Sequence, residues 1–123
     1  MAAFVRAGDI VIGSIHWGGN WGYAVTERER EFAHALIDTA RVDIAHGHSS
    51  HHVKGIEVYR GRPVMYGCGD LLNDYEGIGG DEAYHGELGL MYFASIDTAA
   101  IATRLIMRTV QNALLSFMES PRR

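Results

Sequence analysis

Two short apolar segments with one capped helix between them constrain the fold of this chain most strongly. Asp9–Ile15 is rich in isoleucine and valine, which is typical of a strand buried on both faces, and Val42–Ala45 has the same character. The segment between them has the pattern of an amphipathic helix. Strand, helix and strand in this order predict a βαβ unit, in which the two strands run parallel and the crossover is right-handed.

The helix is predicted from its first turn and from its apolar face. Thr26 stands three residues before Glu29, which is the spacing of a capping box that satisfies the free backbone donors of the first turn. Apolar side chains then recur at helical spacing, so we expect one face to pack against the sheet. The members of that face are Phe32, Ala33, Leu36, Ile37 and Ala40.

The rest of the chain predicts mostly antiparallel strands. Gly55–Tyr59 and Pro63–Gly67 are strand-like, and the short connection Arg60–Arg62 between them is typical of a hairpin. Pro63 starts its strand, where its missing N–H does no harm. We therefore expect an α/β fold in which a βαβ unit is followed by mostly antiparallel strands. The further expected elements are a long loop over Leu71–Gly86, strands over Leu88–Ile96 and Ile101–Met107, and a short helix over Val110–Met118.

Length and composition bound the remaining choices. With 123 residues the chain is expected to form a single domain, residues 1–123. A net charge of −4 and the lack of a basic patch argue against a nucleic-acid partner. Cys68 is the only cysteine, so it forms no intrachain disulfide, and its neighbours suit a small buried residue. No apolar stretch approaches the roughly 20 residues of a membrane span, and Met1–Arg6 does not have the pattern of a signal peptide.

Histidines follow both predicted parallel strands. Four imidazoles lie within the eight residues Ala45–His52, and His16 ends the first apolar segment. Ligands of open α/β sheets bind beyond the carboxyl ends of the strands, and neighbouring strands are only about 4.8 Å apart. We therefore expect His16 and His48 to converge, with His51 reaching the same point from a turn that Gly47 allows. These three histidines are the candidate metal-binding and catalytic residues.

Other readings of the same residues stay open. Histidine clusters in loops are often exposed and without function. His46 and His52 flank the candidate ligands, and we expect packing roles for them, with a supporting or phosphate-contacting role as the alternative. We assign no role to His34 and His85. The two tryptophans of the glycine-rich loop, residues 17 and 21, are expected to pack the loop rather than to recognise a substrate.

Several motifs in this order resemble the bacterial capsule-synthesis proteins of the CapA type, also called poly-γ-glutamate biosynthesis proteins, which are similar to calcineurin-like metallophosphoesterases. The resemblance extends over about residues 8 to 97 and includes a His-Trp-Gly motif and a Gly-His-x-x-His motif. The matching segments are Ile15–Gly18, Ala35–Asp38, Asp43–His51, Gly55–Pro63 and Tyr66–Asp70.

The resemblance implies a layered α/β sandwich with a two-metal site at its strand ends, of which this chain looks like the C-terminal half. His16, His48 and His51 match family histidines that bind metal or contact phosphate, whereas Asp70 stands where the family often has asparagine. The family's N-terminal half supplies an aspartate and an asparagine ligand. Three neutral histidines can hold one divalent ion (Mn, Fe or Zn), but they do not balance the charge of a second one. We therefore expect an incomplete site.

Three functions compete on this basis. The first is a CapA-like metallophosphatase-fold protein of capsule or poly-γ-glutamate biosynthesis, which hydrolyses phosphoesters in the intact family and acts on an anionic small molecule or polymer. The second is a noncatalytic metal-binding or oligomeric assembly module. The third is a single-zinc hydrolase with Asp70 or Asp74 as a further ligand or base. An uncovered strand edge would favour self-association or pairing with an N-terminal half. The sequence as given points to the cytoplasm, whereas many family members act at the cell envelope.

Overall fold

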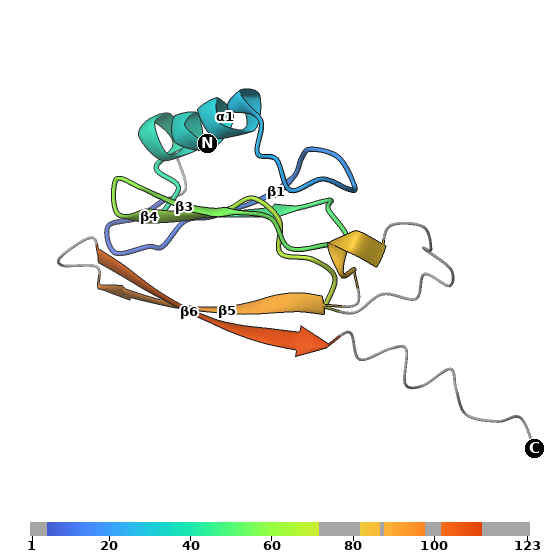
Figure 1. Ribbon diagram of the computed structural model, residues 1–123. Coiled ribbons are helices and arrows are strands. Elements are labelled where there is room, and N and C mark those ends of the chain that lie inside the picture. Colours follow the sequence, from blue (N-terminus) through green and yellow to red (C-terminus); the bar gives the residue numbers. More distant parts are fainter. Residues whose placement is uncertain (1–4, 72–81, 87, 98–101, 112–123) are drawn as a thin grey trace, which may run out of the picture.

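A computed structural model describes residues 5–71, 82–86, 88–97 and 102–111 of the chain. The elements form three layers, with one helix on one face of a four-stranded sheet and a two-stranded hairpin on the other face (Figure 1). This is the α/β class that the sequence predicts. The elements are β1 (Ile12–His16), α1 (Glu27–Ala40), β2 (Ile44–His48), β3 (Ile56–Tyr59), β4 (Arg62–Met65), the 3-10 turn η2 (Glu82–Tyr84), β5 (Leu88–Asp97) and β6 (Ala102–Gln111).

The predicted βαβ unit is present. Strands β1 and β2 pair in parallel, and the larger sheet has the order β1-β2-β4-β3. Helix α1 joins them and begins as the capping box predicts. The hydroxyl of Thr26 accepts a hydrogen bond from the backbone N–H of Glu29, and the Glu29 carboxylate accepts one from the N–H of Thr26. Arg41 in the left-handed conformation ends the helix.

Both parallel strands differ from their predicted bounds. β1 runs to His16 and β2 runs to His48, so the histidines lie within the strands rather than beyond them. β1 is also an edge strand, and Ile12 is 61% exposed, so the expectation of a strand buried on both faces is wrong. The apolar character of a short run does not reveal whether a second strand lies beside it.

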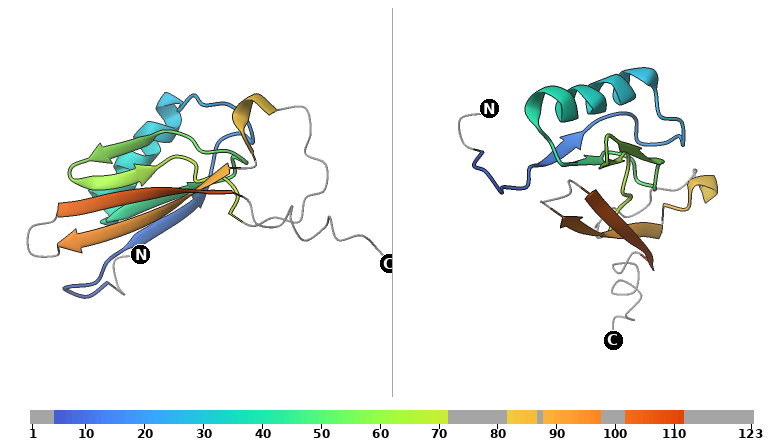
Figure 2. Two further views of the ribbon diagram at one scale, coloured as in Figure 1. Left: turned by 60° about the horizontal axis from the view of Figure 1, so that its bottom comes forward. Right: turned by 90° about the vertical axis from the view of Figure 1, so that its left-hand side faces the viewer.

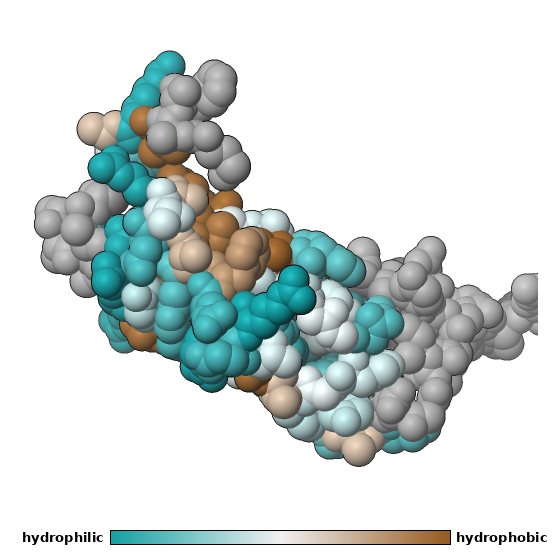
Figure 3. Space-filling model, turned by 90° about the horizontal axis from the view of Figure 1, so that it is seen from above, coloured by the Kyte–Doolittle hydropathy of each residue, from teal (hydrophilic) through white to brown (hydrophobic). Residues whose placement is uncertain are grey.

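Two hydrophobic clusters hold the layers together. The cluster between α1 and the sheet confirms the predicted helix face at Ala33 and Ile37, but Phe32 on the same face is half exposed. The second cluster joins the sheet to the β5–β6 hairpin. Its buried members are Ile44, Met65 and Cys68, against which Ile56, Tyr92 and Ile96 pack. On the side of the molecule that carries α1, apolar surface forms a band bordered by hydrophilic side chains (Figure 3).

The predicted β3–β4 hairpin is confirmed. Arg60 and Gly61 form its two-residue turn with φ values of 50° and 76°, which is the left-handed pair that matches the twist of the strands. Pro63 is the second residue of β4 and pairs with Val58 of β3. The pairing of β4 with its other neighbour, β2, begins only at Val64, so the missing N–H of proline interrupts no ladder.

The long hairpin at the end of the described chain is only partly as predicted. Strands β5 and β6 pair antiparallel over ten residues each, and the hairpin lies along the sheet face opposite α1 (Figure 2). The strand expected over Ile101–Met107 continues to Gln111, so the helix expected from Val110 is wrong at its first two residues. The remainder of that expected helix and residues 72–81 of the expected loop lie outside the described residues. No helix of the described chain is long and apolar enough to cross a membrane.

Candidate functional site

His16 and His48 lie side by side on one face of the sheet. They are the last residues of β1 and β2, and they are directly opposite each other in the parallel register. Their Nδ1 atoms are 3.4 Å apart and their ring centroids 5.3 Å apart. Both side chains are exposed. The sequence prediction that these two histidines converge is therefore confirmed.

Ser14 and His46 extend this arrangement by one step along the strands. They are also paired in the register, and the Ser14 hydroxyl lies 3.3 Å from His46 Nδ1. The His46 ring centroid is 5.9 Å from that of His48. Burial, followed by the charge of His48, lowers the pKa of His46, which keeps it neutral near pH 7. We call Ser14, His16, His46 and His48 the histidine face.

His51 contacts Asp70 and Trp21. Its Nδ1 lies 2.8 Å from the carboxylate of Asp70, and its ring tilts against Trp21 at a centroid distance of 5.5 Å. Within the part of the chain that the structure describes, no three histidine, cysteine or acidic side chains are placed to hold a metal ion. The assignment of His16, His48 and His51 to one ion therefore stays a prediction.

His52, which follows His51 in the sequence, is packed into the fold. His52 is fully buried; its Nε2 accepts a 3.0 Å hydrogen bond from the N–H of Gly22, and its Nδ1 lies 3.0 Å from the carbonyl oxygen of Val53. Because Nε2 accepts a hydrogen bond, Nδ1 is the nitrogen that donates to the Val53 carbonyl oxygen. The ring stacks on Trp21 and Tyr84 at centroid distances of 5.9 Å and 4.9 Å. This matches the packing role expected for His52.

Gly47 serves a different purpose from the one expected. It lies inside β2 and makes no bend. Instead, a Cβ atom at this position would meet Trp17 Nε1 and would lie 2.7 Å from the carbonyl oxygens of both Met65 and Tyr66. The glycine lets the Trp17 indole cross β2 and donate a 2.9 Å hydrogen bond to the Tyr66 carbonyl oxygen. The loop tryptophan packs as expected, but against the sheet.

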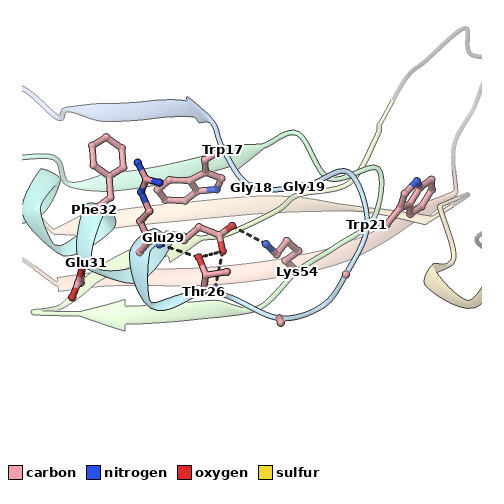
Figure 4. A pocket seen from close by; sticks show the side chains of 12 residues that line it. Trp17, Gly18, Gly19, Trp21, Thr26, Glu29, Glu31, Phe32 and Lys54 are labelled. Atoms are coloured by element: carbon pink, nitrogen blue, oxygen red, sulfur yellow. Dashed lines mark hydrogen bonds and ion pairs between the residues drawn. The ribbon is translucent and has the colours of Figure 1, made fainter.

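A pocket of about 910 Å³ opens between the loop of residues 17–22 and the start of α1 (Figure 4). Lys54 and Glu29 lie at its floor as a buried ion pair, with 2.9 Å between Nζ and Oε1. Burial alone would raise the pKa of Glu29, but the hydrogen bonds from Lys54 and Thr26 outweigh it, so the pKa is lowered. Our reading of the sequence missed this pair, because Glu29 was explained by its capping role and Lys54 belongs to no motif.

Comparison with known proteins identifies the class of this protein, in which two parallel strands are joined by a helix and end in paired histidines. Residues 2–75 match the family of the bacterial capsule synthesis protein PGA_cap, and the chain belongs to this family. The family resemblance drawn from the motifs is thereby confirmed.

Individual relatives agree with this assignment. The chain is 57% identical over 95 residues to a probable polyglutamine synthesis accessory protein of Mycobacterium tuberculosis (strain H37Rv), which covers 77% of this chain and 25% of the relative. It is 38% identical over 66 residues to the PGA biosynthesis protein CapA of Bacillus subtilis (54% of this chain, 17% of the relative). Identity to the capsule biosynthesis protein CapA of Bacillus anthracis is 30% over 66 residues (54% and 16%). The chain thus spans a quarter or less of the length of these relatives.

Proposed function

We propose that this chain takes part in the synthesis of an anionic capsule polymer, such as poly-γ-glutamate, and that its histidine face contributes ligands to a metal-dependent phosphoester hydrolase. Membership of the capsule-synthesis family supports the first part. The single observation that carries the second part is the pair of imidazole nitrogens on adjacent strand ends, His16 Nδ1 and His48 Nδ1, at 3.4 Å.

The separation of these two nitrogens fits one shared ion. Zinc binds histidine nitrogen at about 2.0–2.1 Å in tetrahedral geometry, so two histidines on one ion have nitrogens about 3.3–3.4 Å apart. The observed 3.4 Å between His16 and His48 agrees with this value. A divalent ion at this position would act as a Lewis acid on a phosphoryl oxygen.

The chain's own residues would orient the remaining ligands. Asp70 holds Nδ1 of His51, which is the usual way in which a carboxylate fixes the ring of a metal-binding histidine. We assign His51 to the same site as a third ligand on this ground and on the family motif. In this arrangement Asp70 positions a ligand, so we do not assign it as a ligand or a base. The carboxylates that a second ion requires would come from the parts of the full-length family members that this chain does not cover.

Metal titration tests the proposal. Calorimetric titration of Zn²⁺ and of Mn²⁺ into the whole chain should show binding that His16→Ala and His48→Ala each weaken at least about tenfold. His85→Asn is the matched control: residue 85 is an exposed histidine with φ 52°, a conformation that asparagine tolerates. Unchanged affinity and stoichiometry in both alanine variants would contradict the metal site.

A noncatalytic assembly module is the second candidate. It is favoured by the histidine face, where His16 on the edge strand β1 lies beside His48 on β2 and both side chains are exposed. Turnover of a generic phosphodiester with added metal separates the two candidates. Metal binding without turnover, also in the presence of the rest of a full-length relative, would favour the assembly module; turnover that His48→Ala abolishes would favour the hydrolase.

A further inference from the structure

We propose that the pocket between residues 17–22 and the first turns of α1 binds an anionic, peptide-like chain in which carboxylates alternate with aliphatic segments. The inference names a ligand for a site separate from the histidine face, and it rests on the proposed function only for the choice of a glutamate polymer as the probe. We call this site the loop pocket, and its lining residues used below are Trp17, Gly18, Trp21, Arg28, Glu29, Glu31, Phe32 and Lys54.

The walls of the loop pocket are aromatic. Trp17 stacks on Tyr66 and meets the edge of Phe32 at a centroid distance of 6.2 Å, while Trp21 stands at the opposite end (Figure 4). Phe32 belongs to the apolar face of α1, yet it is 50% exposed because it borders the pocket instead of the core. Aromatic surface of this kind removes methylene groups of a ligand from water.

The floor of the loop pocket offers hydrogen-bond donors. Both oxygens of Glu29 are already engaged, Oε1 by Lys54 and Oε2 by the N–H and the hydroxyl of Thr26. The Lys54 ammonium has three N–H groups, and among the described residues its hydrogen-bond acceptor is Glu29 Oε1. Its side chain is only 4% exposed, so the donors left over face a partly desolvated space in which an anionic acceptor is favoured.

The rim of the loop pocket offers one charged hydrogen-bond donor and one charged acceptor. Arg28 is exposed there and has the planar guanidinium that binds a carboxylate through two hydrogen bonds. Glu31 on the same rim accepts hydrogen bonds, which suits an amide N–H of a peptide-like chain. The volume of about 910 Å³ lies within the range of small-molecule sites.

Gly18 keeps the floor accessible. Its φ of 73° is a conformation that side chains rarely adopt, and a Cβ atom there would meet Glu29 Oε1. Any larger residue would therefore stand over the Lys54–Glu29 pair and separate it from the ligand. A glycine at this point leaves the buried pair open to the pocket.

Intrinsic fluorescence tests the inference directly, since both tryptophans of the chain line the loop pocket. A γ-linked glutamate trimer, titrated into the chain in the presence of EDTA, should change the emission in a saturable and salt-sensitive way. The same γ-linked trimer with its carboxylates converted to carboxamides is the neutral control and should have little effect. An α-linked glutamate trimer shows whether the linkage matters. Because metal is absent, failure of the metal site leaves this result unaffected.

Variants distinguish the loop pocket from a general charge effect. Arg28→Gln should raise the half-saturating concentration about three- to tenfold. Arg60→Gln is the matched control, because that arginine lies in the β3–β4 turn and pairs with Asp38 at 3.0 Å. The double variant Glu29→Gln/Lys54→Met removes the donors without leaving a buried unpaired charge, and glutamine still serves in a capping box.

Three results of the fluorescence titration would overturn the inference. They are an emission that does not respond to the γ-linked glutamate trimer, an equal response to the neutral trimer, and an equal loss of affinity in Arg28→Gln and Arg60→Gln. The double variant should fold, as circular dichroism would check, and should lose the saturable response. If it folds and still binds as the parent does, Lys54 does not recognise the ligand and the inference is wrong.

Discussion

The indole of Trp17 crosses strand β2 at Gly47, so closely that no Cβ atom fits between them. Its Nε1 donates to the carbonyl oxygen of Tyr66, just after the end of β4, and its ring stacks on Tyr66. Trp17 directly follows His16, so this contact ties the end of β1 to the far side of β2. The position of His16 beside His48 therefore depends on Gly47, which has no side chain.

Gly47→Ala should destabilise the chain strongly. The added Cβ lies 2.7 Å from two backbone carbonyl oxygens, which cannot move aside as a flexible side chain could. We expect a loss of about 2–3 kcal/mol in the free energy of unfolding, measured by urea denaturation. Gly55→Ala is the control, because its nearest neighbour is a Val25 methyl group at 3.8 Å, and it should change stability little. Equal midpoints for the two variants would show that this close approach is unimportant.

Local signals in the sequence were sufficient for the βαβ unit and for the hairpin that follows it. The Thr26–Glu29 capping box predicted the helix start, and the short connection Arg60–Arg62 predicted the hairpin, because each depends on residues a few positions apart. The convergence of His16 and His48 followed from parallel pairing alone. These predictions needed no knowledge of distant contacts.

The features that were missed all depend on contacts between distant residues. Lys54 pairs with Glu29 from 25 positions away, and the Gly47 backbone is approached by Trp17 from 30 positions away. The exposure of Ile12 depends on which strands lie beside β1, and periodicity does not encode that. The extension of β6 to Gln111 likewise follows from its pairing with β5 rather than from its own composition.

Glu57→Gln should make the acid unfolding of the chain less steep. Glu57 accepts hydrogen bonds from the Tyr66 hydroxyl (2.6 Å) and from Arg30 (3.3 Å), and its other oxygen lies 2.9 Å from His34 Nε2. Burial alone would raise the pKa of Glu57, but the hydrogen bonds from Tyr66 and His34 and the nearby charges outweigh it, so the pKa lies below its ordinary value of 4.5. As the pH falls, the unfolded chain therefore binds a proton at Glu57 before the folded chain does.

The sign of the effect follows from this shift. The stabilisation by Glu57 is complete above about pH 4.5 and is lost as the pH falls through the lowered pKa of the folded state. At pH 7 we expect Glu57→Gln to lose about 1–2 kcal/mol in the free energy of unfolding. Below pH 4.5 the difference in the free energy of unfolding between Glu57→Gln and the parent should become smaller. Thermal unfolding from pH 7 to pH 3 measures this difference, with Glu27→Gln at an exposed position as the control. A difference that stays constant with pH would contradict the linkage.

Cys68 should resist thiol reagents in the folded chain. It is buried in the cluster between the sheet and the β5–β6 hairpin, and burial raises the pKa of its thiol to about 11, with a partly opposing effect of the Tyr92 hydroxyl. At pH 8 the reactive thiolate is then about one part in a thousand, and access is blocked as well. We expect no reaction with an aromatic disulfide reagent under native conditions and one thiol per chain in denaturant. Rapid stoichiometric labelling of the folded chain would show that the hairpin does not cover this cluster.

The outer edge of β1 should cause the chain to associate. The carbonyl oxygen of Val11 and the N–H of Trp17 both bond to residues of β2 or just before it. By the alternation of a strand, the backbone groups of Ile12, Ser14 and His16 therefore point away from β2, to the side of β1 on which no described strand pairs. None of these three carries the permanent charge that protects exposed edges from pairing. A second copy of β1 can therefore add to this edge.

Ile12→Lys tests this association, because it places a charge in the middle of the exposed apolar segment without disturbing the core: Ile12 is 61% exposed. We expect the parent chain to grow in mean mass with concentration in light scattering and the variant to remain closer to the monomer. Val58→Lys is the matched control on the other edge strand, β3, where that residue is 68% exposed. If both variants reduce association equally, the charge acts through general solubility; if the parent is monomeric at all concentrations, the edge of β1 does not pair with a second copy.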